Sequence, residues 1–277
     1  MQIYSIQTGF FKLDGGAMFG VVPKKMWEKM NPPDESNLCT WSMQCLLIIH
    51  NDRKILIDCG IGDKQDEKFK SHFHPHGEYS LINSLEKHSI FPEDITDVFL
   101  THLHFDHCGG ALKMENGTIV PTFPNATYWS NSVHWDWATN PNFREKASFL
   151  PENILPLKEQ GLLKMIDIQQ DIEWMKDIRI KFMYGHTEAM MCPIIKNNNE
   201  TLIYCADLIP SIHHIGMPYI MSYDIRPLET MKEKEEILNF AYQNNAKLIL
   251  EHDPIYEYCT VTKNDKSQFI VADKGKL

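Results

Sequence analysis

Four residues that can bind metal ions lie within six positions of the chain, directly after a short apolar run. They are His102, His104, Asp106 and His107, in the pattern His-x-His-x-Asp-His. In extended backbone the side chains of His102 and His104 point to the same side, so both imidazoles can bind one cation. After the turn that follows, Asp106 and His107 can face a second cation, and Gly109-Gly110 permits a tight backbone path. Buried histidines with a purely structural role usually occur singly, so the cluster predicts metal binding.

Four ligands are too few for two cations, so the hypothesis requires further histidines or carboxylates at the ends of later strands. Three such residues follow apolar runs: His186 after residues 178–183, Asp207 after 202–206 and His252 after 248–251. His186 can complete the first site and His252 the second, while the two oxygens of Asp207 can bridge the cations. Each residue alone would as readily be an ordinary polar residue at a strand end, but their joint placement favours ligands.

These ligands must be positioned by strands and helices. Apolar runs rich in β-branched and aromatic residues predict strands at 45–49, 54–58, 97–100, 126–129, 178–183, 201–205 and 247–250. Helical patterns cover residues 78–88 and 228–244. Strands and helices are mixed throughout, without a solenoid repeat or a flexible linker. We therefore predict that residues 1–277 form a single α/β (α+β) domain, with stacked sheets and outer helices.

The composition excludes several classes of protein. With 43% hydrophobic and 23% charged residues, the chain has the composition of a folded globular protein. Its net charge of −10, without a basic stripe, argues against nucleic-acid partners. We find no membrane-spanning apolar stretch and no export signal after Met1, and we expect a cytoplasmic protein that does not contact membranes. Seven cysteines without a Cys-x-x-Cys pair predict reduced, buried thiols.

The order of these motifs, from Asp58 to His252, resembles the metallo-β-lactamase superfamily. The motifs are His-x-His-x-Asp-His, then Gly-His-Thr, then Ala-Asp, then a late histidine. The resemblance implies an αββα sandwich of two packed mixed sheets, and two divalent cations, Zn²⁺ above all, with Co, Fe or Mn as alternatives. It places one cation on His102, His104 and His186, the other on Asp106, His107 and His252, and Asp207 between them. Asp58 resembles the aspartate that lies beneath the metals in this family.

The ligand set also indicates the branch of the superfamily. The lactam-hydrolysing enzymes with a cysteine ligand would need Cys in place of Asp207, and the flavo-diiron proteins would need Glu in place of His104. The intact set resembles that of the glyoxalase II, phosphodiesterase and lactonase branches. The acidic charge argues against the tRNA-processing nucleases of the superfamily.

Two further segments are similar to YtnP-type quorum-quenching lactonases. They are residues 13–24, which include Met18 and Phe19, and Met221-Ser222-Tyr223-Asp224. This similarity implies hydrolysis of N-acyl-homoserine lactones, with Met18, Phe19 and Phe105 lining an apolar wall for the acyl chain. Core packing is an equally good interpretation of Met18 and Phe19. Relatives suggest a homodimer.

The implied reaction is the opening of a lactone ring by a metal-bridging hydroxide, with Asp106 moving the proton to the leaving alkoxide. Pro210 stands where better-known homoserine-lactone hydrolases have a tyrosine, so we expect Tyr223 to supply the phenol that orients the carbonyl. The alternatives are an arylesterase or organophosphate triester hydrolase and a metal-binding sensor without turnover. We interpret His72, His74 and His76 as loop residues without a metal. His213 and His214 follow Asp207 closely, so they either support the ligands or contact substrate, although exposed loop histidines are commoner.

Overall fold

The computed structural model describes residues 1–169 and 172–277 of the chain. By its internal contacts the chain divides into two compact units. The first unit consists of Met1–Gly9 and Met43–Gln169, and the second of Phe10–Ser42 and Gln170–Leu277. The prediction of one domain over residues 1–277 stays a prediction.

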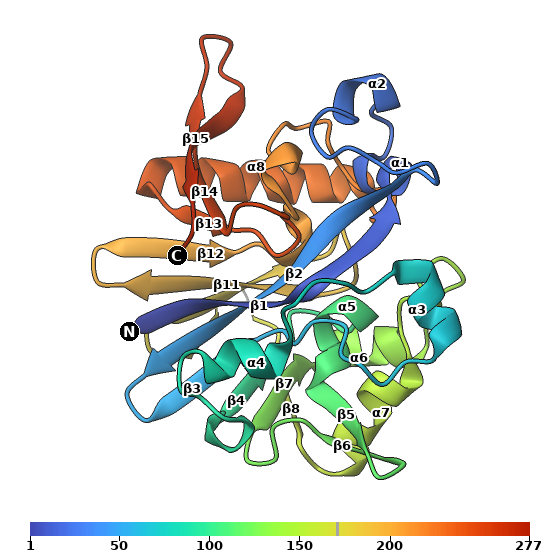
Figure 1. Ribbon diagram of the computed structural model, residues 1–277. Helices are drawn as coiled ribbons and strands as arrows, with labels where there is room; N and C mark the ends of the chain where they lie inside the picture. The colour runs from blue at the N-terminus through green and yellow to red at the C-terminus, as the bar shows by residue number, and fades with distance from the viewer. Residues whose placement is uncertain (170–171) are drawn as a thin grey trace. The chain divides into compact units, whose positions relative to one another are not determined.

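The first unit is built on strands of a six-stranded sheet whose order is β1-β2-β3-β4-β7-β8 (Figure 1). The strands are β1 (Gln2–Asp14), β2 (Leu38–His50), β3 (Arg53–Ile57), β4 (Asp97–Phe99), β7 (Thr127–Asn131) and β8 (Leu163–Ile166). Strands β2 and β3 are antiparallel, whereas β3, β4, β7 and β8 run parallel to one another. Parallel strands end at the same edge of a sheet, and loops that follow them are the usual place for functional side chains.

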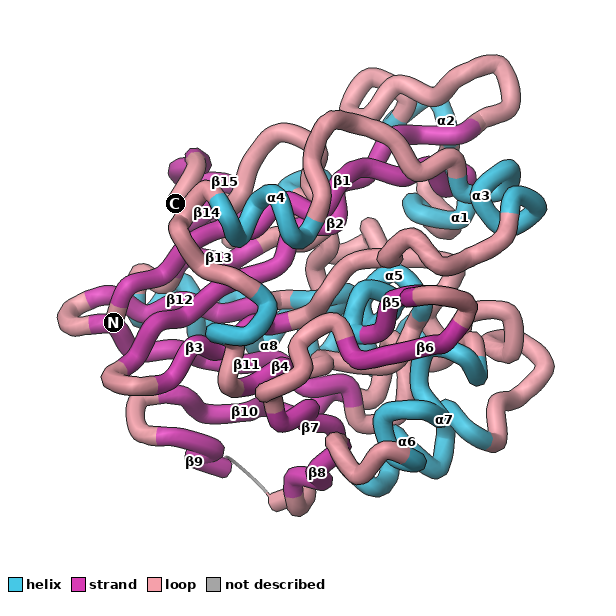
Figure 2. Tube along the Cα trace, turned by 60° about the horizontal axis from the view of Figure 1, so that its bottom comes forward, coloured by secondary structure: helices cyan, strands magenta, loops and turns pink. Residues whose placement is uncertain are grey.

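Short helices connect these strands. They are α3 (Glu67–Phe73), α4 (Leu81–Glu86), η1 (Pro92–Asp94), α5 (Phe105–Cys108), η2 (Gly109–Ala111), α6 (Ser132–Thr139) and α7 (Pro151–Glu159). The hairpin of β5 (Leu112–Glu115) and β6 (Thr118–Pro121) packs beside α7 (Figure 2). A continuous hydrophobic core fills the unit, and Phe123, Tyr128 and Leu157 are among its fully buried members.

The second unit contains a seven-stranded sheet in the order β15-β14-β13-β12-β11-β10-β9. The strands are β9 (Ile172–Met175), β10 (Ile178–Met183), β11 (Met190–Asn197), β12 (Glu200–Tyr204), β13 (Lys247–Ile249), β14 (Tyr258–Lys263) and β15 (Phe269–Gly275). Strands β12 and β13 are parallel and the other pairs are antiparallel. The long helix α8 (Pro227–Asn244) lies along this sheet, as Figure 1 shows. The unit also has α1 (Gly15–Phe19), α2 (Lys24–Trp27), η3 (Ala206–Leu208) and η4 (Ile212–His214).

Every strand predicted from the sequence is present, although several have different bounds. Strand β2 begins at Leu38 rather than at residue 45. The predicted strand is too short because the polar residues Ser42 and Gln44 interrupt the apolar pattern, although both are buried in the structure. The predicted helix at 78–88 is too long. Its structured part, α4, starts after Ser80, whose hydroxyl accepts a hydrogen bond from the Asn83 N–H and so caps the helix.

Two other observations concern the chain as a whole. All seven cysteines are buried free thiols, as the sequence predicted. No helix within residues 1–169 and 172–277 is both long enough and apolar enough to cross a bilayer.

Candidate metal centre

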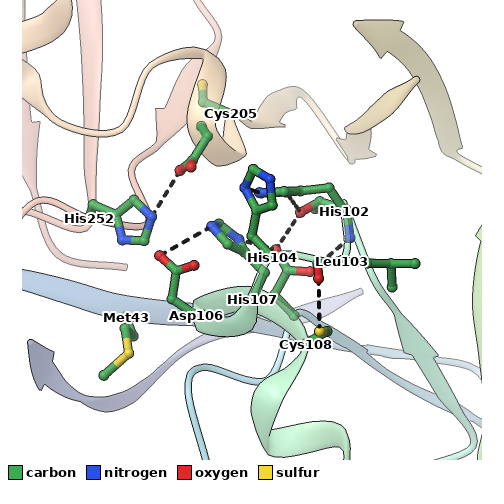
Figure 3. Close-up of polar contacts among 12 residues, drawn as sticks. Met43, His102, Leu103, His104, Asp106, His107, Cys108, Cys205 and His252 are labelled. Atoms are coloured by element: carbon green, nitrogen blue, oxygen red, sulfur yellow. Dashed lines mark hydrogen bonds and ion pairs between the residues drawn. The ribbon is translucent and has the colours of Figure 1, made fainter. Parts of the chain in front are cut away.

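The His-x-His-x-Asp-His motif of the first unit follows β4, the central parallel strand. Residues 101–104 are not helical, and the chain then turns into α5, which carries Asp106 and His107. Figure 3 shows the rings of His102, His104 and His107 close together, with the Asp106 carboxylate directed at His107. The Nε2 atom of His102 and the Nδ1 atom of His104 are 3.1 Å apart. These two nitrogens therefore face one point, as the predicted spacing requires.

Asp58, directly after β3, forms hydrogen bonds that hold the motif in place. The Oδ1 atom accepts a hydrogen bond from the Thr101 N–H at 2.8 Å, and Oδ2 accepts one from the Thr101 hydroxyl at 2.6 Å. Oδ2 also lies 3.1 Å from Nδ1 of His107. Since Thr101 uses its hydroxyl proton on Asp58, Oγ1 is left to accept from His102 Nδ1, 3.1 Å away. Asp58 thus fixes the Nδ1–H tautomer of both rings and leaves their Nε2 atoms for a metal.

The close approach of two backbones explains a glycine in this motif. A Cβ atom on Gly109 would lie 2.1 Å from the carbonyl oxygen of Ile61. The Cys59 N–H donates to the carbonyl of His107 at 2.7 Å, which ties α5 to the loop after β3. A larger residue at 109 would push α5, and with it Asp106 and His107, away from that loop.

The second unit brings together the other three predicted ligands. His186 follows β10, Asp207 lies in η3 after β12, and His252 follows β13. Asp207 Oδ2 is 3.0 Å from His186 Nε2, and Asp207 Oδ1 is 2.9 Å from His252 Nε2. All three side chains are buried. Each carboxylate oxygen therefore faces a different imidazole, the arrangement expected of a carboxylate that bridges two cations.

The remaining ring nitrogens of these histidines also have protein partners. His186 Nδ1 lies 2.8 Å from Asp224 Oδ1, and His252 Nδ1 lies 2.7 Å from the backbone carbonyl oxygen of Ser42. Both partners accept, so each ring keeps a proton on Nδ1 when Nε2 binds a cation. The sequence patterns do not predict Asp224 as a site residue, although the segment that contains it is similar to one in lactonases.

Helix α8 positions the loop that carries His186. Glu233 accepts hydrogen bonds from the Tyr184 N–H at 2.6 Å and the Gly185 N–H at 3.0 Å. The Ile225 N–H donates to the carbonyl of His186 at 3.2 Å. A Cβ atom on Gly185 would lie 2.3 Å from the Thr230 nitrogen, so only glycine allows the loop to pack this closely on α8.

Electrostatics in the second unit favour a cation. Burial by itself lowers the pKa of His186, but Asp207 and Asp224 outweigh it and raise the pKa to about 10. A positive charge on the His186 ring, which lies between the two carboxylates, is thus stabilised. A metal ion can take the place of the proton that gives His186 this charge, so metal binding would release that proton. Imidazole nitrogens of fixed tautomer, together with carboxylate oxygens, are suitable ligands for Zn²⁺, Co²⁺, Fe²⁺ or Mn²⁺.

The residues predicted to contact substrate lie in different surroundings. Phe105 is 6% exposed, beside the ligands, and Tyr223 is 37% exposed and precedes Asp224 in the chain. Met18 and Phe19 are buried. The Phe19 ring is stacked between Trp27 and His214, with centroids 5.0 Å away on each side. Packing therefore accounts for Phe19, and the contact of Met18 and Phe19 with substrate stays a prediction.

The other histidines differ in part from the sequence interpretation. His72 lies in helix α3 and not in a loop, and His74 ends that helix in a left-handed conformation. Neither they nor His76 belong to any group of potential metal ligands among the described residues. The interpretation of His214 as an exposed loop residue is wrong. It is buried between the Ser211 hydroxyl, 2.8 Å away, and the carbonyl of Met18, 2.9 Å away.

Several known proteins are similar to this chain in sequence or in fold. The N-acyl homoserine lactonase AttM of Rhizobium radiobacter is 21% identical over 166 residues, which are 59% of this chain and 60% of AttM. The chain thus spans about 60% of the length of this curated relative. A probable metal-dependent hydrolase from Staphylococcus aureus superposes with a TM-score of 0.89 at 26% identity, over 100% of this chain and 96% of that one. The dizinc quorum-quenching lactonase AidC, solved with a homoserine product, has a TM-score of 0.79 at 20% identity, over 99% and 95%.

The model of the metallo-β-lactamase superfamily matches residues 42–252, which include all seven predicted ligands. The fold is accordingly the metallo-β-lactamase fold, with mixed sheets and helices, as the motif order predicted. The chain belongs to the metallo-β-lactamase superfamily and is a hydrolase of that superfamily.

Proposed function

We propose that the seven predicted ligands form a dinuclear metal centre, and that the protein opens the lactone ring of N-acyl-homoserine lactones. One cation would be held by His102, His104 and His186, the other by Asp106, His107 and His252, with Asp207 between them. The observation that carries the proposal is the position of Asp207, whose two oxygens face two different imidazoles at 3.0 and 2.9 Å.

The substrate class is supported by relatives and by the surroundings of Phe105. AttM is a named N-acyl homoserine lactonase, and AidC was solved with a homoserine product. Phe105 directly follows the ligand His104. Its ring packs against Phe73, with centroids 4.5 Å apart, and edge-on against Phe69 at 5.1 Å. Phe69 and Phe73, both on α3, are half-buried, so the three rings form an apolar surface suited to an acyl chain.

The reaction adds water across the ester bond of the ring. When bound, the two cations supply a water of lowered pKa and polarise the lactone carbonyl. Asp106 accepts the proton of the attacking water and delivers it to the alkoxide oxygen as the ring C–O bond breaks. Tyr223 donates a hydrogen bond from its phenol to the substrate carbonyl. The product is a ring-opened N-acyl-homoserine, whose new carboxylic acid ionises and releases a proton.

Acid release at constant pH tests the proposal. Zinc-loaded protein is given N-acyl-homoserine lactones with short and long acyl chains, and an aryl ester and a phosphotriester are run in parallel. We expect lactone opening that exceeds the other two rates and stops with a chelator. His104→Ala should abolish it, whereas His72→Ala, which changes an exposed histidine of α3, should leave it unchanged.

The other outcomes separate the alternatives. Faster turnover of the aryl ester or the phosphotriester would move the function to an arylesterase or a triester hydrolase. Two bound metals without turnover of any substrate would favour a metal-binding sensor. Full lactone turnover by His104→Ala would contradict the proposed centre. The metal in the cell, the cytoplasmic location and the homodimer remain predictions.

A further inference from the structure

Glu145 is a buried carboxylate beside the ligand His104, and the sequence did not single it out. It is 3% exposed and belongs, like His104, to the first unit. Its Oε1 atom lies 3.6 Å from His104 Nε2. Its Oε2 atom accepts hydrogen bonds from Trp137 Nε1 at 2.8 Å and from Asn142 Nδ2 at 2.5 Å. One oxygen is thus fixed by two donors, which directs the other at the imidazole.

The backbone around Glu145 holds this position. The Asn142 side-chain oxygen accepts from the N–H groups of Arg144 at 2.8 Å and Glu145 at 3.1 Å, which closes a tight turn. The Ser148 N–H donates to the carbonyl of Glu145 at 2.8 Å, and the Phe105 N–H donates to the carbonyl of Ser148 at 3.0 Å. The turn that carries Glu145 is therefore bonded through Ser148 to the residue after His104.

The two ring nitrogens of His104 have different surroundings. Nδ1 lies 3.1 Å from His102 Nε2, on the side of the proposed metal, while Nε2 faces Glu145. A neutral imidazole has one proton, and only the nitrogen without it can bind a cation. At 3.6 Å the carboxylate acts mainly through its charge, which favours the proton on Nε2.

We propose that Glu145 is the positioning residue of His104: it keeps the proton on Nε2, so that Nδ1 is free to bind the metal. His104 is then the only ligand histidine that binds through Nδ1. The other four, His102, His107, His186 and His252, each have an acceptor at Nδ1 that holds a proton there, which leaves Nε2 to bind the cation. Binding of the cation through Nδ1 of His104 requires an acceptor at Nε2, on the opposite side of the ring, where Glu145 lies. The inference rests on the proposed metal centre.

The variant Glu145→Gln tests the proposal without removing volume. The amide oxygen of Gln must accept from Trp137 and Asn142, as Oε2 does now, so the NH₂ group would face His104. An NH₂ group favours an acceptor at Nε2, which moves the ring proton to Nδ1, where it competes with the cation. Loss of such a partner weakens metal binding by about 10- to 100-fold. We expect a loss of this size in the affinity for Co²⁺, measured by competition with a chelator, at one of two sites.

A second readout needs no metal. Nitrogen-15 NMR of the histidine rings at pH 8 reports which nitrogen of His104 carries the proton, and the His104→Gln spectrum assigns the signal. In the wild type we expect the proton on Nε2, and in Glu145→Gln on Nδ1. The matched control is Glu159→Gln, which makes the same change at an exposed position of α7 in the first unit, and it should retain both the tautomer and the Co²⁺ affinity.

The results separate this inference from the proposed function. A tautomer and a Co²⁺ affinity unchanged in Glu145→Gln would overturn the role of Glu145. An equal loss in Glu159→Gln would also overturn it, since the effect would then not come from the carboxylate beside His104. If the wild type binds no Co²⁺, the proposed centre fails, while the tautomer of the metal-free protein still decides what Glu145 does.

Discussion

The Oδ1 atom of Asp224 lies 2.8 Å from Nδ1 of His186, and both side chains are about 1% exposed. The pair is buried beside α8, and Asp207 lies 3.0 Å from the other ring nitrogen. A histidine held between two carboxylates in this way can neither rotate its ring nor change its tautomer. Asp224 therefore determines how His186 presents Nε2, although it is 38 residues away in the chain.

Asp224→Asn should weaken metal binding without removing the hydrogen bond. The amide oxygen of Asn can still accept from His186 Nδ1, but the negative charge that makes the ring a stronger ligand is lost. We expect the affinity for Co²⁺ at one site to fall by about 10-fold or more. Competition with a chelator measures the change. Asp265→Asn, which removes an exposed charge from the same unit, is the control and should bind Co²⁺ as the wild type does. Equal affinities in the two variants would contradict the role of Asp224.

Glu233→Ala should destabilise the loop that carries His186. The side chain is buried and accepts from the N–H groups of Tyr184 and Gly185, which would be left without an acceptor. Leaving buried donors unsatisfied costs about 1–3 kcal/mol each. For the two donors together, we therefore expect the free energy of unfolding in urea to fall by about 2–6 kcal/mol.

Glu235→Ala is the matched control for this loss, since Glu235 is exposed on the same helix. Its free energy of unfolding should stay within about 0.5 kcal/mol of that of the wild type. A similar loss in both variants would show that the effect comes from the helix and not from the loop.

The proposed ligands could be selected from the sequence because their pattern is local. Four of them lie within six consecutive residues, namely His102, His104, Asp106 and His107. His186 and His252 each follow an apolar strand that the sequence predicts. The register of parallel strands then places strand ends at a common edge. No long-range contact had to be known to propose these residues.

The residues that orient the ligands could not be predicted in the same way. Asp224 and Glu145 act through contacts between segments about 40 residues apart, and no spacing in the sequence encodes such contacts. The strands β8 and β9 were missed because their residues are mostly half-exposed and lack a clear alternation. His214 was misjudged because a polar residue in a loop is usually exposed, whereas here Ser211 and Met18 supply partners that permit burial.

Phe69→Ala should affect substrates with long acyl chains more than those with short ones. Phe69 packs edge-on against Phe105, and its removal takes an aromatic ring from the apolar surface beside the metal ligands. Each CH₂ group that loses such a contact forgoes up to about 0.8 kcal/mol. We expect KM to rise at least 10-fold for a ten-carbon acyl chain and less than threefold for a four-carbon chain, with kcat nearly unchanged. Equal changes for both chain lengths would place the acyl chain elsewhere.

Lys234→Met should change how stability depends on pH. Lys234 is fully buried on α8, and its ammonium group donates to the carbonyls of Gly216 at 2.7 Å and Tyr219 at 3.0 Å. Burial lowers its pKa from 10.5 to about 7, against a smaller opposing effect of Asp224. Between these two pH values the unfolded chain binds a proton that the folded protein does not bind. The stability of the wild type must therefore rise with pH across that window, and fall as pH drops toward 7.

Methionine cannot titrate, so this contribution is absent from the variant. The free energy of unfolding of the wild type, measured in urea at pH 7.5, 8.5 and 9.5, should rise relative to that of Lys234→Met by about 1.4 kcal/mol per pH unit at most. Other titrating groups cancel in the difference between the two proteins. Lys232→Met, at an exposed position of α8, should show no such slope. A constant difference between wild type and Lys234→Met would mean that Lys234 stays charged in the fold, with the carbonyls of Gly216 and Tyr219 sufficient to solvate it.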